Sequence, residues 1–189
     1  KDVGKLSDNQ LADIRNKMIG FVFQQYNLLP RMNLLENVEL PLLYAHVSNH
    51  EREKRAMEAL EKVGLAEKAK QMPNQLSGGQ QQRVGIARAL VIDPEIIFAD
   101  EPTGNLDSHT TEEVLALMRN IVEKQRKTLI MVTHDPHIAS WADRQLRVVD
   151  GRIVETVIRK ESKIEEEILR ENGAPTYTVV EKQQEGEAR

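Results

Sequence analysis

The chain has 189 residues, 40% of them apolar, which is enough to bury the core of one domain. Its 26 basic and 30 acidic residues give a formal net charge of -4, so we expect no basic face and no nucleic-acid partner. The absence of cysteine excludes a disulfide framework and a thiolate metal site, and it suits a reducing cytosol.

No stretch approaches the roughly 20 consecutive apolar residues of a membrane-spanning helix. Lys1–Lys5 is also not followed by an apolar signal region. The first residue is not methionine and the pattern begins abruptly. We therefore expect further sequence upstream of Lys1.

The first elements predict an α/β arrangement. Ser7–Asn16 has the pattern of a short helix, with Ser7 as N-cap and Gln10 in the capping-box position. Met18–Phe23 is short and apolar, which predicts a buried strand, and Gln24 begins the loop that follows it. Loops after buried strands are where α/β proteins place their chemistry.

A helical region is predicted from about residue 33 to residue 75. Asn33–His46 has a helical pattern bent at Pro41, and Ser48–Glu51 has the spacing of a capping box that opens a helix ending near Gly64. Ser77 then opens another helix, Gln80–Leu90.

The α/β alternation resumes with an apolar strand, Glu95–Ala99. The later part of the chain predicts an amphipathic helix, a β-branched strand, a helical turn and a hairpin closed by Asp150-Gly151. These elements cover Asp107–Gln125, Thr128–Thr133, Ile138–Ala142, and the pair Arg144–Val149 and Arg152–Val157.

The composition changes after the hairpin. Lys160–Asn172 has the pattern of a charged helix, and Ala174–Arg189 is polar, so we expect it to fray in solvent. The sequence thus predicts a domain over residues 1–157 and a charged C-terminal extension over residues 158–189.

The sharpest chemical signal is a Ser-Gly-Gly turn at the start of a helix. Gly78 and Gly79 let backbone amides approach an anion, the helix dipole adds partial positive charge, and Ser77 supplies a hydroxyl donor. This combination indicates a phosphate ligand, although a Ser-Gly-Gly start by itself is more often only a cap.

Polar side chains also follow two predicted strands. Asp100 and Glu101 end an apolar strand, and because side chains alternate along a strand they point in different directions. One carboxylate can hold hydrated Mg²⁺ while the other polarises a water. Asp107 lies in the next loop, and His134 follows the strand Thr128–Thr133.

Together these motifs resemble the ATPase subunit of ABC transporters. Leu76-Ser77-Gly78-Gly79-Gln80 resembles the ABC signature, Ile96–Glu101 a Walker B strand and Asn105-Leu106-Asp107 the D-loop, while His134 resembles the switch histidine and Gln24 the Q-loop glutamine. The segments 20–30 and 35–38 further resemble the macrolide-export and lipoprotein-release (MacB/LolD-like) subfamily. The resemblance covers Lys1 to about Val157, and it implies a P-loop NTPase core with an inserted helical subdomain.

The resemblance also implies roles. Glu101 would be the general base, Asp100 would hold Mg²⁺, His134 would contact the γ-phosphate of ATP, and Gln24 would sense metal and water. The signature residues Ser77, Gly78, Gly79 and Gln80 would contact ATP on a second protomer in a head-to-tail dimer, with Asp107 coupling the two sites. The implied partner is a membrane permease, and the implied place is peripheral, on the cytoplasmic face of the membrane.

One family motif does not occur among the 189 residues, namely the phosphate loop Gly-x-x-x-x-Gly-Lys-Ser/Thr. In the family this loop lies upstream of the Q-loop, so we expect it before Lys1 and expect the isolated chain not to bind ATP. In related sheets the strand bearing the loop lies between the strands here Thr128–Thr133 and Gln145–Val149. The sequence therefore predicts a one-strand gap with two unpaired edges.

Two other functions stay open from the sequence. A non-catalytic ABC module could lend only its signature half-site to a partner, but the presence of Glu101 and His134 argues against it. A DNA-repair or chromosome-organising ABC ATPase would carry a long coiled coil, whose heptads do not occur here.

Overall fold

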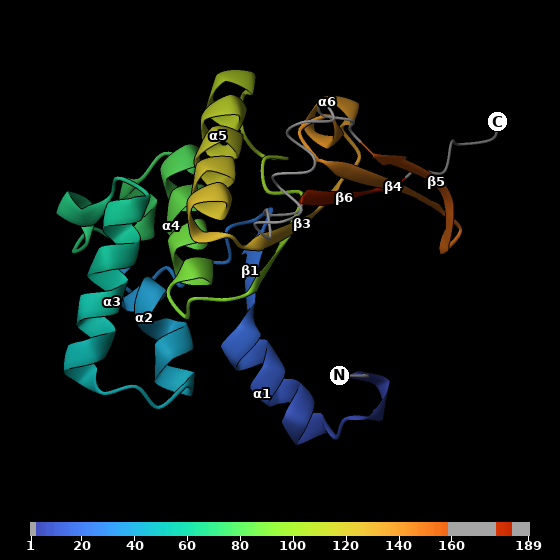
Figure 1. Ribbon diagram of the computed structural model, residues 1–189. Coiled ribbons are helices and arrows are strands. Elements are labelled where there is room, and N and C mark those ends of the chain that lie inside the picture. Colours follow the sequence, from blue (N-terminus) through green and yellow to red (C-terminus); the bar gives the residue numbers. More distant parts are fainter. Residues whose placement is uncertain (1–2, 159–176, 183–189) are drawn as a thin grey trace.

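The computed structural model describes residues 3–158 and 177–182 (Figure 1). Its strands form one six-stranded sheet in the order β1-β2-β3-β6-β4-β5, in which only β5 runs antiparallel to its neighbour. The strand bounds are β1 Ile19–Phe23, β2 Ile96–Asp100, β3 Thr128–Thr133, β4 Arg144–Val149, β5 Arg152–Ile158 and β6 Tyr177–Lys182.

The larger helices gather on one side of β1, β2 and β3, as Figure 1 shows. The helix bounds are α1 Asp8–Met18, α2 Leu34–Tyr44, α3 Asn49–Lys62, α4 Gly78–Leu90, α5 Ser108–Gln125 and α6 Pro136–Ala139. Three short 3₁₀ turns cover Val3–Lys5, Ala66–Lys68 and Pro73–Gln75. Within the described residues, no helix is both long enough and apolar enough to cross a membrane.

Most of the predicted helix starts are confirmed by their capping bonds. The Ser7 and Ser77 hydroxyls each accept a backbone N–H three residues later, in full capping boxes. The capping box expected at Ser48 is wrong, because the Ser48 side chain makes no capping bond. Glu51 pairs with Arg55 one turn further along, at 2.7 Å, instead of reaching back to the N-cap. This hydrogen bond also lowers the pKa of Glu51.

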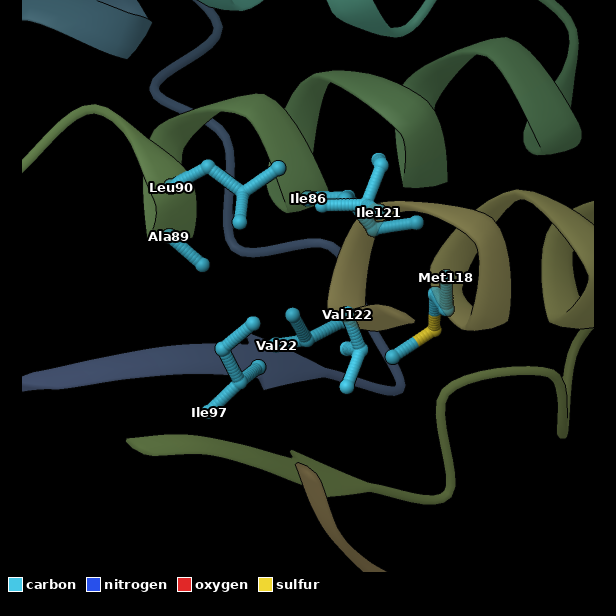
Figure 2. A pocket seen from close by; sticks show the side chains of 8 residues that line it. All are labelled: Val22, Ile86, Ala89, Leu90, Ile97, Met118, Ile121 and Val122. Atoms are coloured by element: carbon cyan, nitrogen blue, oxygen red, sulfur yellow. The ribbon is translucent and has the colours of Figure 1, made fainter. Parts of the chain in front are cut away.

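The main core lies between the sheet and the helices α4 and α5. Val22, Ile97 and Leu129 from successive strands are all at least 96% buried and face this layer. A small apolar pocket remains between the packed side chains (Figure 2), and it is lined by Val22, Ile86, Ala89, Leu90, Ile97, Met118, Ile121 and Val122. Because the lining is entirely apolar, we assign this pocket to the core.

The face of β1–β3 that points away from α4 and α5 is more exposed to solvent than the apolar sequence of β1 predicts. Phe21 and Phe23 of β1 are 41% and 37% exposed, and Phe21 stacks on both Phe23 and Phe98. Parallel sheets usually bury both faces. In the described part of the chain, the α2–α5 layer covers only the other face of β1–β3.

The hairpin β4–β5 forms as predicted. Asp150 and Gly151 have φ values of 48° and 73°, the positive values that a tight two-residue turn requires. The helical turn α6 begins two residues earlier than expected, because Asp135 caps it and Pro136 fits its first position.

The predicted one-strand space is present, because β3 and β4 do not pair with each other, but the prediction that its two edges are unpaired is wrong. β6 lies between β3 and β4, parallel to both, and its residues pair with Leu129–Thr133 on one side and Arg144–Val148 on the other. The expectation that Ala174–Arg189 frays in solvent is therefore also wrong for Tyr177–Lys182. The charged helix predicted over Lys160–Asn172 lies outside the described residues.

Candidate functional site

The predicted polar residues meet at one edge of the sheet. β1, β2 and β3 are adjacent and parallel, so their carboxyl ends lie side by side. Gln24 follows β1, Asp100 and Glu101 end β2, and His134 follows β3. The fold thus places four of the predicted site residues on three neighbouring strand ends, where open α/β sheets hold their ligands.

Glu101 and His134 are in direct contact. The Nδ1–H of His134 donates to Glu101 Oε1 at 2.5 Å, and the backbone N–H of His134 donates to the same oxygen at 3.1 Å. The Thr133 hydroxyl lies 3.4 Å from Oε2. The carboxylate is 18% exposed and the imidazole 52% exposed, so the pair is held by the fold and still open to solvent.

The backbone at Glu101 makes this contact possible. Glu101 has a φ of 45°, which is uncommon for a residue with a side chain. Its N–H continues the β2–β3 pairing by donating to Val132, and its carbonyl accepts from Gly104 in a tight turn. The chain therefore turns sharply after β2, and such strained positions cluster at functional sites.

The two neighbouring acids occupy different surroundings, as the alternation of a strand predicts. Asp100 is exposed at the end of β2, whereas Glu101 is partly buried against His134. Among the described residues no cluster of three or more His, Asp and Glu side chains could hold a metal ion. Any cation at this edge would therefore depend on Asp100, on the amide of Gln24 and on oxygen atoms of a ligand.

The loops after β1 and β2 are tied together. Asn105 donates to the carbonyl of Gln24 at 3.0 Å. Gly104 lies against the Gln24 side chain, so closely that an added Cβ would come 2.6 Å from its amide nitrogen. A side chain at position 104 would displace the Gln24 amide, so the glycine lets Gln24 lie beside the loop that carries Glu101.

The Ser-Gly-Gly turn lies at the N-terminus of α4. Ser77 is exposed and Gln80 is half-buried, while Gly79 is buried and leaves no room for a side chain against Thr110. Gly78 faces the hydroxyl of Tyr26, which an added Cβ would approach to 2.9 Å. Burial raises the pKa of Tyr26. The start of α4 thus presents Ser77 outward, in a position that a second molecule can reach.

Asp107 caps the neighbouring helix α5. Its carboxylate accepts the backbone N–H of Thr110 at 3.0 Å and the Thr110 hydroxyl at 2.7 Å. The hydroxyl bond is the main cause that lowers the pKa of Asp107. Because Thr110 also contacts Gly79, the starts of α4 and α5 form one unit.

Three residues that hold the site together were not predicted from the sequence. Gln82 is fully buried and donates to the carbonyl of Pro102 at 2.5 Å, which ties α4 to the loop after Glu101. Arg88 donates to the carbonyls of Tyr26 and Asn27 at 2.7 and 2.6 Å, and burial lowers its pKa. Asn37 is fully buried and bonds the backbone of Leu29 in both directions.

The sequence could have indicated a specific partner for Arg88, but not for Gln82. Arg88 interrupts the otherwise apolar run from Ile86 to Leu90, which marks it as a charge with a specific partner. Gln82 is one of three consecutive glutamines, and nothing in the sequence distinguishes the buried one.

Comparisons with known proteins identify the family and the fold. A family model described as "ABC transporter" matches residues 2–104. The chain is 56% identical over 153 residues to an uncharacterized ABC transporter ATP-binding protein of Thermotoga maritima, an alignment that covers 81% of this chain and 65% of that protein. It is 48% identical over 164 residues to the macrolide export ATP-binding/permease protein MacB of Chlorobaculum tepidum, covering 87% of this chain and 25% of that protein.

A solved cassette has the same fold. The structure described as the dimeric structure of MJ0796, a bacterial ABC transporter cassette, superposes with a TM-score of 0.73 at 46% identity, over 84% of this chain and 70% of that chain. A second structure of MJ0796, with a TM-score of 0.72, is described as a post-hydrolysis state bound to ADP and Pi.

The chain belongs to the ABC transporter family, as the family model and these relatives show. The predicted α/β P-loop NTPase fold is confirmed, and so is the resemblance to ABC ATPases with MacB-type relatives. The chain spans less than two thirds of the length of the Thermotoga relative. The roles of the individual site residues stay predictions.

Proposed function

We propose that this chain forms the hydrolytic edge of an ABC transporter ATPase, in which Glu101 is the general base. The observation that carries the proposal is the Glu101–His134 contact of 2.5 Å at the carboxyl ends of β2 and β3. Both His134 donors bind Oε1, so Oε2 is the oxygen that can accept a proton from water. In the closed site His134 contacts the γ-phosphate.

The described residues can bind part of an ATP–Mg²⁺ ligand, namely the cation. Asp100 and Gln24 offer oxygen ligands for the cation, and when bound the cation neutralises charge on the phosphate oxygens. These residues do not form a phosphate-binding cradle, because the Gly-x-x-x-x-Gly-Lys-Ser/Thr loop and its lysine do not occur in the sequence. The solved relative described as holding ADP and Pi supports ATP as the nucleotide.

We infer that the working unit is a head-to-tail dimer. The exposed Ser77, with Gly78, Gly79 and Gln80, would bind the γ-phosphate of ATP held by the second protomer, and Asp107 would connect the two sites through Thr110 and Gly79. A solved relative is described as dimeric, which supports this arrangement.

We also infer a transport role from the MacB relative, whose name joins an ATP-binding part to a permease. The ATPase would power export or lipoprotein release through a membrane permease, from a peripheral position on the cytoplasmic face. The helical region from Leu34 to Gln75 is the part that we expect to contact the permease.

The proposal is tested by comparing the chain alone with a chimera in which an ABC phosphate-loop segment is joined ahead of Lys1. The chain alone should show no ATP binding by calorimetry, and micromolar binding would contradict this. The chimera should hydrolyse ATP. Glu101→Gln should lower its turnover by roughly 100-fold or more without loss of ATP binding.

The control variant is Glu95→Gln, which changes an exposed acid at the opposite end of β2. Unchanged hydrolysis in Glu101→Gln would refute the catalytic role. A chimera that binds ATP and dimerises but never hydrolyses it would favour the non-catalytic module that lends only a signature half-site.

A further inference from the structure

The side chain of Tyr26 connects the loop after β1 to the start of α4. Its hydroxyl lies so close to Gly78 that an added Cβ there would come 2.9 Å from it. Its carbonyl oxygen lies further along the same helix, 3.7 Å from a Cβ added at Gly85. These two glycines are two helical turns apart, which is roughly 10 Å along one face. The phenol of Tyr26 therefore lies along α4 and points toward residues 77–80, which we name the signature turn.

The backbone of Tyr26 is held in place. Arg88, near the end of α4, donates to the carbonyls of Tyr26 and Asn27 at 2.7 and 2.6 Å. The N–H of Tyr26 donates to the carbonyl of Phe23 at 3.2 Å, which closes a turn at the end of β1. Tyr26 and Asn27 have φ values of 59° and 48°, which are uncommon for residues with side chains and persist where the surroundings hold them. The phenol thus extends from a fixed point.

The hydroxyl end of the phenol packs against one side of the signature turn. Burial raises the pKa of Tyr26, as expected for a hydroxyl that is packed away from water. On the other side, a methyl group of Leu106 lies 3.5 Å from the same Cβ position on Gly78. Gly78 is therefore enclosed by one side chain from the loop after β1 and one from the loop after β2. Close packing of this kind leaves the turn little freedom to shift.

A fixed turn matters for the chemistry proposed above. The signature turn would bind a phosphate through its backbone N–H groups, and their directions depend on where the turn lies. Donors of this kind contribute most when they already point at the ligand before it binds, because no reorganisation is then needed. Loss of the Tyr26 hydroxyl would remove the contact on one side of Gly78 and give the turn more freedom.

We propose that Tyr26 is a positioning residue for the signature turn: its phenol extends from Gly85 to Gly78 and fixes the directions of the N–H groups of the turn. The consequence for a dimer rests on the proposed function, whereas the contact itself rests on packing within one chain. The loop after β1 would then contribute to the half-site that binds ATP of the second protomer, in addition to the role proposed for Gln24.

Two alanine substitutions test the contact in the chain alone. Gly78→Ala should lower the folding equilibrium constant by roughly fivefold or more in urea denaturation, because its Cβ meets the Tyr26 hydroxyl. In a Tyr26→Phe background the same substitution should cost less than about twofold, because the remaining neighbours lie at 3.5 and 3.8 Å. The matched control is Gly85→Ala, which faces the carbonyl of Tyr26 and should have the same effect in both backgrounds.

Equal effects of Gly78→Ala in the two backgrounds would overturn the contact. Unfolding of Gly78→Ala in both backgrounds would overturn it as well, because the hydroxyl would then not be what the added Cβ meets.

Hydrogen exchange tests the positioning in the chain alone. Tyr26→Phe should speed the exchange of the backbone N–H groups of residues 79 and 80 by at least about threefold, because the turn opens more often. The measurement is NMR on the folded protein. The control is Gln25→Ala, which changes an exposed neighbour in the same loop and should leave this exchange as it was. Unaltered exchange in Tyr26→Phe would show that Tyr26 does not position the turn.

The phosphate-loop chimera with Glu101→Gln tests the consequence for the dimer. Tyr26→Phe should raise the dissociation constant of the ATP-driven dimer by roughly fivefold or more, with ATP affinity of the monomer unchanged. A purely structural role would lower stability without this selective loss, and an unchanged dissociation constant would contradict the proposal. If the chimera with Tyr26 intact stays monomeric with ATP, the proposed function fails, while the exchange of residues 79 and 80 still decides whether Tyr26 positions the turn.

Discussion

At the residue scale, few hydrogen bonds hold the Glu101 carboxylate. Oε1 is occupied by His134, and Oε2 is left with a long contact to Thr133. The sequence placed both residues after predicted strands, and the resemblance to ABC ATPases assigned both to one nucleotide site. It could not predict that the backbone of Glu101 adopts a positive φ, since this depends on the turn to Gly104.

Gln82 provides a stability test at this scale. Gln82→Leu removes the donor to Pro102 and should lower the free energy of unfolding by about 1–3 kcal/mol, because the buried Pro102 carbonyl loses its partner. The measurement is urea denaturation, with the exposed Gln25→Leu as control. A Gln82→Leu protein as stable as the control would mean that the bond does not tie α4 to the loop.

Asp107 gives a pH-dependent prediction. Its pKa in the folded chain is lowered, so the cap stabilises the fold above the unfolded pKa, near 3.8, and this stability is lost as pH falls through the lower folded value. Thr110→Val replaces the hydroxyl with a methyl group and keeps the backbone N–H, and in an NMR titration it should raise the Asp107 pKa toward its ordinary value.

The control for this prediction is Thr111→Val on the same helix. The stability difference between Thr110→Val and the natural chain should be present at pH 7 and shrink below pH 3.8. An Asp107 pKa that does not respond to Thr110→Val would contradict the assigned cause.

At the scale of elements, α4 positions the site through its whole length. Ser77 at its start faces outward, Gln82 holds the loop after Glu101, and Arg88 holds the loop after β1. The helix and its cap could be predicted from Ser77 and the periodicity that follows. The Gln82 and Arg88 partners could not, because they lie about 20 and 60 residues away along the chain.

A pair of glycines tests the packing of α4. A Cβ on Gly20 would collide with the carbonyl of Ala89, so Gly20→Ala should destabilise the fold by about 1–3 kcal/mol. Gly85 lies inside α4, where an added Cβ meets nothing closer than 3.7 Å. Gly85→Ala should be neutral or stabilise by up to about 1 kcal/mol. The measurement is the thermal unfolding temperature of both variants. A Gly20→Ala protein that is more stable than Gly85→Ala would refute this packing.

At the scale of the whole molecule, the fold class and the order of elements from residue 7 to residue 158 followed from the sequence because local signals agree there: caps, apolar strands and the Asp150-Gly151 turn. β6 was missed although Tyr177, Thr178, Val179 and Val180 are all residue types that strands favour. The polar composition of the surrounding segment hid this local signal, and its pairing partners β3 and β4 follow only from the tertiary fold.

The exposure of the aromatic side chains on β1 also depends on the tertiary fold, so local sequence signals did not predict it. Phe21 and Phe23 belong to an apolar strand, and apolarity alone predicts burial on both faces. Their exposure depends on which faces the helices cover, and α4 and α5 cover only the face that carries Val22.

The central claim is that this site is one half of a nucleotide sandwich, and sedimentation of the phosphate-loop chimera tests it most directly. In a Glu101→Gln background, ATP should convert the chimera from monomer to dimer. Ser77→Arg should keep it monomeric without loss of ATP binding, because Ser77 is exposed at the start of α4. A Ser77→Arg protein that dimerises as readily with ATP, or a chimera that hydrolyses ATP as a monomer, would contradict the account.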